Sequence, residues 1–473
     1  MAFWNRRKSL ETATTRHAHS ALKPTLSWPH LVGLGVGGIV GTGIYTLTGV
    51  GAGLAGPGVM MSFVIAGIVC ACAALAYAEM ATMMPMAGSA YTYTYVALGE
   101  LLAWIVGWCL ILEYTVVCSA VAVGWSGYAA GVIKSAGWSV PDALLAGPYV
   151  HGGLINVPAI VISLVVAGLL ALGTRESATV NLVLVFVKLV ALAAFIALAL
   201  PAFDAGHFHP FAPYGWDAQE IDGTKRGIMA AAAVIFFAFY GFDAVSTAAE
   251  EARNPGRDLK IGILGSMVVC TILYMAVAAA ALGGSTYQQL ADSSEPLAMV
   301  LRNLSHPVAA TLIASAAVIA LPTVIMAFMY GQSRIFFVMA RDGLLPQRLS
   351  AVSARSGTPV MMTLITGVIV AAIAGFLPLK LIAELANAGT LVAFIAVAVC
   401  MMVLRVKAPA QPRKFVAPAP WLVGIVAILG CAYLFWSLPF ITKKFFLIWN
   451  AAGLIVYGLW ARHRSLLATA GAS

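Results

Sequence analysis

Long apolar runs separated by short polar stretches occupy almost the whole chain. Twelve of these runs are long enough to cross the hydrocarbon layer of a membrane as a helix, which takes about 20 residues. They cover residues 28–54, 57–83, 96–133, 155–173, 178–200, 224–249, 259–284, 306–340, 359–376, 379–404, 420–439 and 444–461. No strand-like alternation with turn signals competes with them, so the pattern predicts an all-α integral membrane protein with twelve transmembrane helices.

The first and sixth runs are interrupted near their centres by residues that favour a break in a helix. The first contains GGIVGTGI at residues 37–44, and the sixth contains FFAFYGFDAV at residues 236–245. Backbone that leaves the helix inside a membrane is tolerated only where it lines a cavity or binds a ligand. Free N–H groups of one half-helix suit a carboxylate and free carbonyls of the other suit an ammonium group, so the breaks predict a site for a small zwitterion. Close helix packing is the alternative explanation for Gly41 and Gly43.

The two interrupted runs stand five runs apart, which predicts two five-helix units of opposite orientation, a 5+5 inverted repeat. No loop is long enough to form a separate soluble domain. The expected organisation is a cytoplasmic tail (1–27), a first repeat (28–200), a second repeat (224–405), two further helices (420–461) and a second cytoplasmic tail (462–473).

Composition and charge fit this location. The chain is 61% hydrophobic and only 10% charged, which excludes an ordinary soluble protein. Its net charge of +9 comes from Lys and Arg residues that, with the amino terminus inside, fall mostly in the cytoplasmic loops, as the positive-inside rule requires. The charge therefore reflects topology, and we expect a multi-pass protein of the plasma (inner) membrane with both termini cytoplasmic and no nucleic-acid partner. The seven cysteines lie inside the runs and are expected to pack as small apolar residues.

Four ionisable residues lie within the runs and away from their obvious ends: Glu79, Glu113, Lys188 and Asp243. Lys188 is the deepest, and an intramembrane charge is functional by default, so we interpret it as a proton carrier. The alternative is a structural lysine that binds backbone carbonyls of the broken first helix. Glu113 is interpreted as its counter-charge or as an acid of the side-chain pocket, Asp243 as a helix cap or a gate, and Glu79 as a carboxylate at a helix end.

Motifs of other membrane proteins are missing or incomplete. The GWSG at residues 124–127 matches part of an intramembrane serine protease motif, but no histidine lies deep in a run to act as its base, so an enzyme is not expected. No phosphate-binding G-x-x-x-x-G-K-[ST] occurs, so transport would be driven by a gradient and not by ATP. No repeated filter sequence favours a channel.

Four stretches resemble the cationic amino acid transporter branch of the amino acid, polyamine and organocation superfamily. They are GVGGIVGTGIYTLTG, AYAEMATMMPMAGSAYTYTYVALGELLAWIVGW, FFAFYGFDAVSTAAEEARNPGRDLKIGI and YGQSRIFFVMARDGLLP, and the likeness extends from Trp28 to Arg405. The resemblance implies a LeuT-type fold of twelve helices, alternating access, and an amino acid site between the first, third, sixth and eighth spans.

The resemblance also implies roles for individual residues. The backbone near Gly41, Thr42 and Gly43 would bind the carboxylate of the substrate. The carbonyls of Ile39, Phe237 and Tyr240 would bind its amino group. Glu113 and Asp243 would belong to the site or its gate. Val117 and Phe328 would face the pocket, where their bulk favours a small or neutral amino acid over a long cationic one. Lys188 resembles the lysine that replaces a sodium ion in proton-coupled members, so no sodium site and no metal are expected.

The sequence therefore predicts a proton-coupled symporter for small neutral or cationic amino acids. The alternative is an exchanger of amino acids or polyamines without obligatory proton coupling. The expected partners are the amino acid substrate and the bilayer, including lipid or sterol contacts. The sequence identifies no protein partner.

Overall fold

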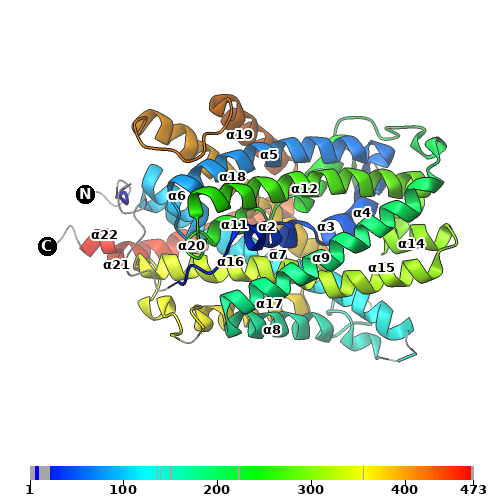
Figure 1. The fold of residues 1–473 in the computed structure, drawn as a ribbon, viewed down its shortest axis with the longest axis horizontal. Coiled ribbons are helices and arrows are strands. Elements are labelled where there is room, and N and C mark those ends of the chain that lie inside the picture. The colour runs from blue at the N-terminus through cyan, green and yellow to red at the C-terminus, as the bar shows by residue number, and fades with distance from the viewer. Residues whose placement is uncertain are drawn as a thin grey trace.

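Helices form nearly all of the regular structure, as the apolar runs predicted (Figure 1). The computed structural model describes residues 6–9, 22–135, 137–138, 140–149, 152–221, 224–293, 295–354 and 356–469.

Each apolar run of the predicted first repeat coincides with one helix or with a broken series of helices. They are α2 (Trp28–Ile39) with α3 (Thr42–Tyr45) and α4 (Leu47–Ala55), then α5 (Val59–Met83), α7 (Glu100–Ser135), α8 (Val157–Leu172) and α9 (Thr174–Ala199).

The runs of the predicted second repeat coincide with helices in the same way. They are α10 (Ile228–Ile235) with α11 (Asp243–Thr247), then α12 (Pro255–Gly284), α15 (Pro307–Ala320) with α16 (Pro322–Arg341), α17 (Val360–Phe376) and α18 (Leu379–Lys407). The last two runs form α19 (Pro420–Ser437) and α20 (Phe440–Val456). Several of these helices begin at proline, which suits the first helical position because its missing N–H would have no partner there.

Nine helices within the described residues are long and apolar enough to cross a membrane, fewer than the twelve expected. Two helices, α8 and α17, are apolar but have only 16 and 17 residues. The first expected span is divided after Ile39. Its second part joins the second expected span in one apolar helical stretch, Leu47–Met83. The chain is thus a multi-pass helical membrane protein. The difference between nine and twelve spans comes from the short helices α8 and α17 and from the broken first span.

Several short elements between the runs were not predicted. They are α6 (Ser89–Ala97), α13 (Tyr287–Asp292), α14 (Pro296–Asn303), the antiparallel strands β1 (Gln219–Ile221) and β2 (Thr224–Arg226), α21 (Arg462–Arg464) and α22 (Leu466–Thr469). Each is too short to give a clear periodic pattern.

The cysteines pack as expected, and Glu79 lies near the end of α5. All seven cysteines are free, and six are buried. Glu79 is only 1% exposed, accepts a hydrogen bond from Arg405 at 2.5 Å, and lies 3.2 Å from Nε of Arg413. It therefore ties the end of α5 to the end of α18 and to the segment between α18 and α19, so the carboxylate near the helix end is paired.

The first and last described residues of the chain lie together at one end of the helical bundle. Arg6 donates a hydrogen bond to the carbonyl of Arg462 at 2.8 Å, and Lys8 pairs with Asp342 at 2.6 Å. Most long helices run between this end and the opposite one, with α2, α7 and α16 at the centre and α8 and α17 along one flank (Figure 1).

Candidate functional site

The first break lies where the glycine pattern predicted it. Helix α2 ends at Ile39, Val40 has an extended backbone with φ −76° and ψ 96°, and α3 begins at Thr42. The final carbonyls of α2 therefore lose the N–H partners that a continuing helix would provide.

The second break follows α10. A short 3-10 turn covers Phe236–Ala238, Gly241 adopts φ +125°, and α11 begins at Asp243. This φ favours glycine because a side chain would be strained there. One oxygen of Asp243 accepts the Gly241 N–H at 3.0 Å and the other accepts the Tyr114 hydroxyl. Asp243 thus bonds the backbone of the break and links it to α7, but its side chain does not form the helix cap that was one of the two interpretations, because the N–H it accepts precedes α11.

The two breaks touch through their backbones. A Cβ atom on Gly241 would lie 2.6 Å from the carbonyl carbon of Gly38, and one on Gly43 would lie 2.5 Å from Cα of Ala238. Only glycine permits such close backbone approach at these two positions.

A small cavity lies at this crossing, between α2, α3, α7, α16 and the turn after α10. It is lined by Gly38, Ile39, Gly41, Gly43, Val117, Phe237, Tyr240, Val324 and Phe328. Seven of the ten residues predicted for the substrate site are therefore brought together here. Tyr240 is the lining residue with a polar side chain, and its hydroxyl is buried without a hydrogen-bond partner among the described residues.

The three other predicted residues lie elsewhere around the crossing. Thr42 opens α3, and its side chain lies outside the described residues. Asp243 accepts the Gly241 N–H at the second break. Glu113 packs against α18, where a Cβ on Gly389 would lie 3.0 Å from the Glu113 Cβ. Both carboxyl oxygens of Glu113 are buried without hydrogen-bond partners among the described residues.

Sequence reasoning missed two contributors. Val324 lines the cavity one helical turn before Phe328, and its Cγ2 lies 2.6 Å from where a Cβ on Gly41 would be. The four-residue spacing from Phe328 could have identified it. Tyr274 of α12 donates a 2.5 Å hydrogen bond to the carbonyl of Ile39, one of the carbonyls assigned to the substrate amino group. Nothing in its sequence context distinguished this tyrosine from a packing residue.

Lys188 lies beside the first break. The side chain is fully buried, and its Nζ donates hydrogen bonds to the carbonyls of Gly37, at 3.2 Å, and Val40, and to the Thr323 hydroxyl, at 2.5 Å. The lysine therefore joins α9 to the end of α2 and the start of α16. No ion pair in the described part of the chain joins it to Glu113, so the structure does not support Glu113 as its counter-charge.

The arrangement can bind a small molecule that carries both a positive and a negative group. Its polar groups are those of the opened backbone, while Val117, Val324 and Phe328 form an apolar wall. No cluster of His, Cys, Asp and Glu suitable for a metal occurs among the residues that the structure describes.

Known proteins resemble the chain over nearly its whole length. The family model described as amino acid permease matches residues 26–460. A branched-chain amino acid permease of Bacillus subtilis is 42% identical over 466 residues, covering 98% of each chain. A methylthioribose transporter of the same organism is 39% identical over 464 residues, again with 98% of each chain covered. Cationic amino acid transporter 3 of Arabidopsis thaliana is 38% identical over 415 residues, which cover 85% of this chain and 66% of that protein.

These are transport proteins and not enzymes. With a family match and extensive identity along the chain, the protein belongs to the amino acid permease family, within the amino acid, polyamine and organocation superfamily.

Proposed function

We propose that the chain is a proton-coupled amino acid symporter of the plasma membrane that works by alternating access in a twelve-helix, LeuT-type fold. The observation that carries this proposal is the meeting of two helix breaks around one cavity, with Lys188 bonded to the opened end of α2. Opened backbone inside a membrane is costly unless it lines a cavity or binds a ligand.

In this proposal the backbone binds the common part of an amino acid. The carboxylate lies against the N–H groups of Thr42 and Gly43, and the amino group lies against the carbonyls of Phe237, Tyr240 and Ile39. The Ile39 carbonyl has a second lone pair beside the one used by Tyr274, so both can be bound.

The apolar wall selects a neutral side chain. Val117, Val324 and Phe328 offer no charge to a cationic group, and the carboxyls of Glu113 and Asp243 lie outside the lining. We therefore propose small or branched aliphatic amino acids as substrates in preference to long cationic ones. A relative named as a branched-chain amino acid permease supports this choice.

Lys188 would couple the proton to the movement of α2. A charged ammonium has three N–H donors, which match its three acceptors at Gly37, Val40 and Thr323. Loss of the proton removes the charge and one N–H donor, so the hydrogen bonds from Lys188 to the end of α2 become weaker. The two protonation states then favour two positions of this half-helix, which is the requirement for a switch.

The test is uptake of labelled amino acids into proteoliposomes with an imposed pH gradient. Lys188→Ala should abolish gradient-driven accumulation, because no other amine replaces the three hydrogen bonds. Lys444→Ala, the same change at an exposed lysine of α20, should accumulate substrate like the wild type. Wild-type accumulation by Lys188→Ala would contradict the assigned role.

A second candidate is an exchanger of amino acids or polyamines in which Lys188 only holds α2. The hydrogen bonds of Lys188 to the Gly37 and Val40 carbonyls are also compatible with this candidate, because a purely structural lysine would make the same contacts. Wild-type transport that ignores the pH gradient and needs internal substrate would support this exchanger.

A further inference from the structure

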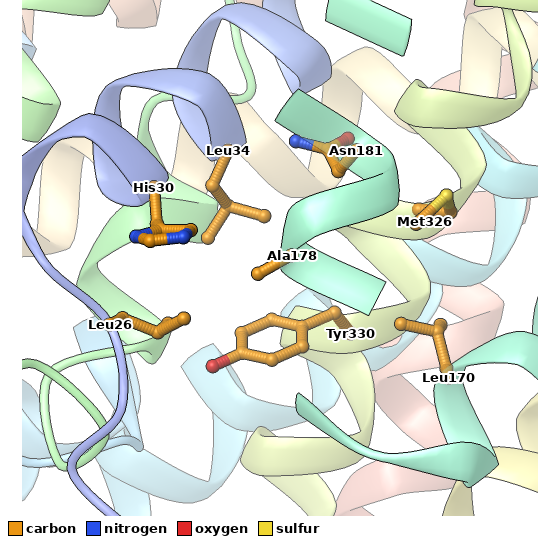
Figure 2. Close-up of a pocket in the computed structure, with 8 residues that line it drawn as sticks. All are labelled: Leu26, His30, Leu34, Leu170, Ala178, Asn181, Met326 and Tyr330. Carbon is orange, nitrogen blue, oxygen red and sulfur yellow. The ribbon is translucent and has the colours of Figure 1, made fainter. Parts of the chain in front are cut away.

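A second cavity lies between the first half of α2 and helices α8, α9 and α16 (Figure 2). Most of its wall is apolar, but three side chains bring polar atoms to it, namely His30, Asn181 and Tyr330. Figure 2 shows Asn181 and His30 on different sides of the space, with the Tyr330 ring along its lower edge.

Two polar atoms of this wall lack partners. Oδ1 of Asn181 and the hydroxyl of Tyr330 are buried and form no hydrogen bond within the part of the chain that the structure describes. The two residues are only 3% and 4% exposed. Buried polar atoms are nearly always hydrogen-bonded, and ordered water supplies the bond where protein does not. The cavity has room for at least one water molecule, which could bind the two polar atoms that lack protein partners.

Asn181, which lines this space, lies beside Gly37, whose carbonyl binds Lys188. Asn181 and Lys188 lie seven residues apart on α9, which is about two helical turns and places them on one face. A Cβ on Gly37 would lie 2.8 Å from Oδ1 of Asn181, and the carbonyl of the same Gly37 accepts a hydrogen bond from Lys188 at 3.2 Å. Asn181 also donates to the Gly33 carbonyl at 3.0 Å, so α9 contacts successive turns of α2.

The outer end lies toward the end of the bundle that holds both ends of the chain. His30 is half-buried near the start of α2, with Nδ1 at 2.9 Å from the Ser27 hydroxyl. One turn beyond Tyr330, the guanidinium of Arg334 lies 3.7 Å from the Tyr330 ring centre and pairs with Glu251 at 2.9 Å. Among the described side chains at this end, His30, Arg334 and Glu251 are charged or can titrate.

We propose that this second cavity is the water-filled route by which Lys188 exchanges its proton with the side of the membrane that holds the termini. In the release step an N–H bond of the ammonium breaks, the nitrogen keeps the electron pair, and the proton forms an O–H bond to water. Asn181 and Tyr330 are positioning residues that hold this water, and His30 accepts the proton at the outer end. The inference rests on the proposed proton coupling and adds to it the path and the residues.

Hydroxyl-radical footprinting of the whole protein in lipid tests the water without depending on transport. Met326 lines the second cavity, whereas Met329, on the same helix and completely buried, does not. We expect Met326 to be oxidised several-fold faster than Met329, and Asn181→Leu to reduce that difference. Equal protection of the two methionines in the wild type would overturn the proposal even if proton coupling is real.

Transport by two variants tests the path. Asn181→Leu replaces the amide with an apolar side chain of similar size, and Tyr330→Phe removes only the hydroxyl. If Asn181→Leu does not fold, Tyr330→Phe still tests the path. Each should slow proton-driven uptake several-fold while exchange of labelled for unlabelled substrate stays unchanged. Val183→Leu, on the exposed face of α9, is the matched control and should leave both activities unchanged.

Three results are distinguishable. Unchanged proton-driven uptake in both variants would overturn the route, and so would a parallel loss of exchange, which would place the cavity on the substrate path. Wild-type protein without any proton-driven uptake would contradict the proposed function itself, and footprinting of Met326 would still report whether water occupies the space.

Discussion

At the scale of single residues, the site depends on glycines that let two backbones meet. Gly43 faces Ala238, and Gly241 faces Gly38, at distances that leave no space for a side chain. The glycine-rich pattern was visible in the sequence, and it located the first break correctly. The residues that fill the space around it, such as Val324 and Tyr274, become visible only when helices far apart in sequence are packed together.

Gly43→Ala should abolish uptake. The new methyl group would lie 2.5 Å from Cα of Ala238, so the two breaks would have to move apart. Radiolabelled uptake at equal protein expression measures the effect. Gly168→Ala in α8 is the control, because a Cβ there meets nothing within 4 Å, and activity of Gly43→Ala equal to this control would show that the contact is dispensable.

Val324→Ala should shift substrate preference toward larger neutral side chains. Shortening this side chain enlarges the cavity beside Gly41. Competition by a panel of unlabelled amino acids should show larger aliphatic or aromatic residues gaining relative to alanine by several-fold, since one or two methylene groups in an apolar pocket are worth about 1–3 kcal/mol. Val308→Ala, at an exposed position of α15, should leave the order of preference unchanged. The same order of substrate preference in both variants would show that Val324 does not determine specificity.

Glu113→Gln should preserve uptake. A carboxylate buried without partners is costly, so we expect Glu113 to carry a proton, and glutamine is a neutral group of nearly the same shape. Uptake measured across a range of external pH values checks this, with Glu113→Lys as the contrasting change that should disrupt the contact with α18. Loss of uptake in Glu113→Gln would instead indicate that the group must change its charge.

At the scale of elements, buried ion pairs connect the segment after α11 to α16. Glu251 pairs with Arg334, both about 1% exposed, and Glu250 pairs with Arg341 at 2.7 Å. The sequence placed the charged stretch EEARNPGRDLK in a loop, where a solvated run was an adequate explanation. Its burial against α16 could not be predicted, because charge pairing between distant segments leaves no local periodic signal.

Arg334→Met should lower the thermal stability of the purified protein substantially. Removing one partner of a buried ion pair leaves the other charge uncompensated and costs about 3–5 kcal/mol. Arg302→Met breaks an exposed pair with Glu295 and should cost less than about 1 kcal/mol. Melting temperatures measured in the same detergent compare the two, and equal shifts would mean that the Arg334 pair is not specially stabilising.

At the scale of the whole molecule, hydropathy alone predicted a polytopic helical membrane protein, and almost every run coincides with a helix. It predicted neither the short helices between the spans nor the contacts at the ends. Burial in this bundle comes from helix packing as well as from lipid, so hydropathy marks the helices but does not say which ones meet. The relation between the two breaks was predictable because they lie five apolar runs apart, and this spacing can be read along the whole sequence.

Glu100 at the start of α7 contacts both ends of the described chain. Its carboxylate accepts hydrogen bonds from Tyr457 and from Ser465 and lies 3.4 Å from Arg6. The same helix carries Val117 in the cavity wall. The contacts of Arg6, Tyr457 and Ser465 therefore converge on a helix that also forms part of the cavity wall, and we expect an affinity tag fused close to these residues to slow uptake.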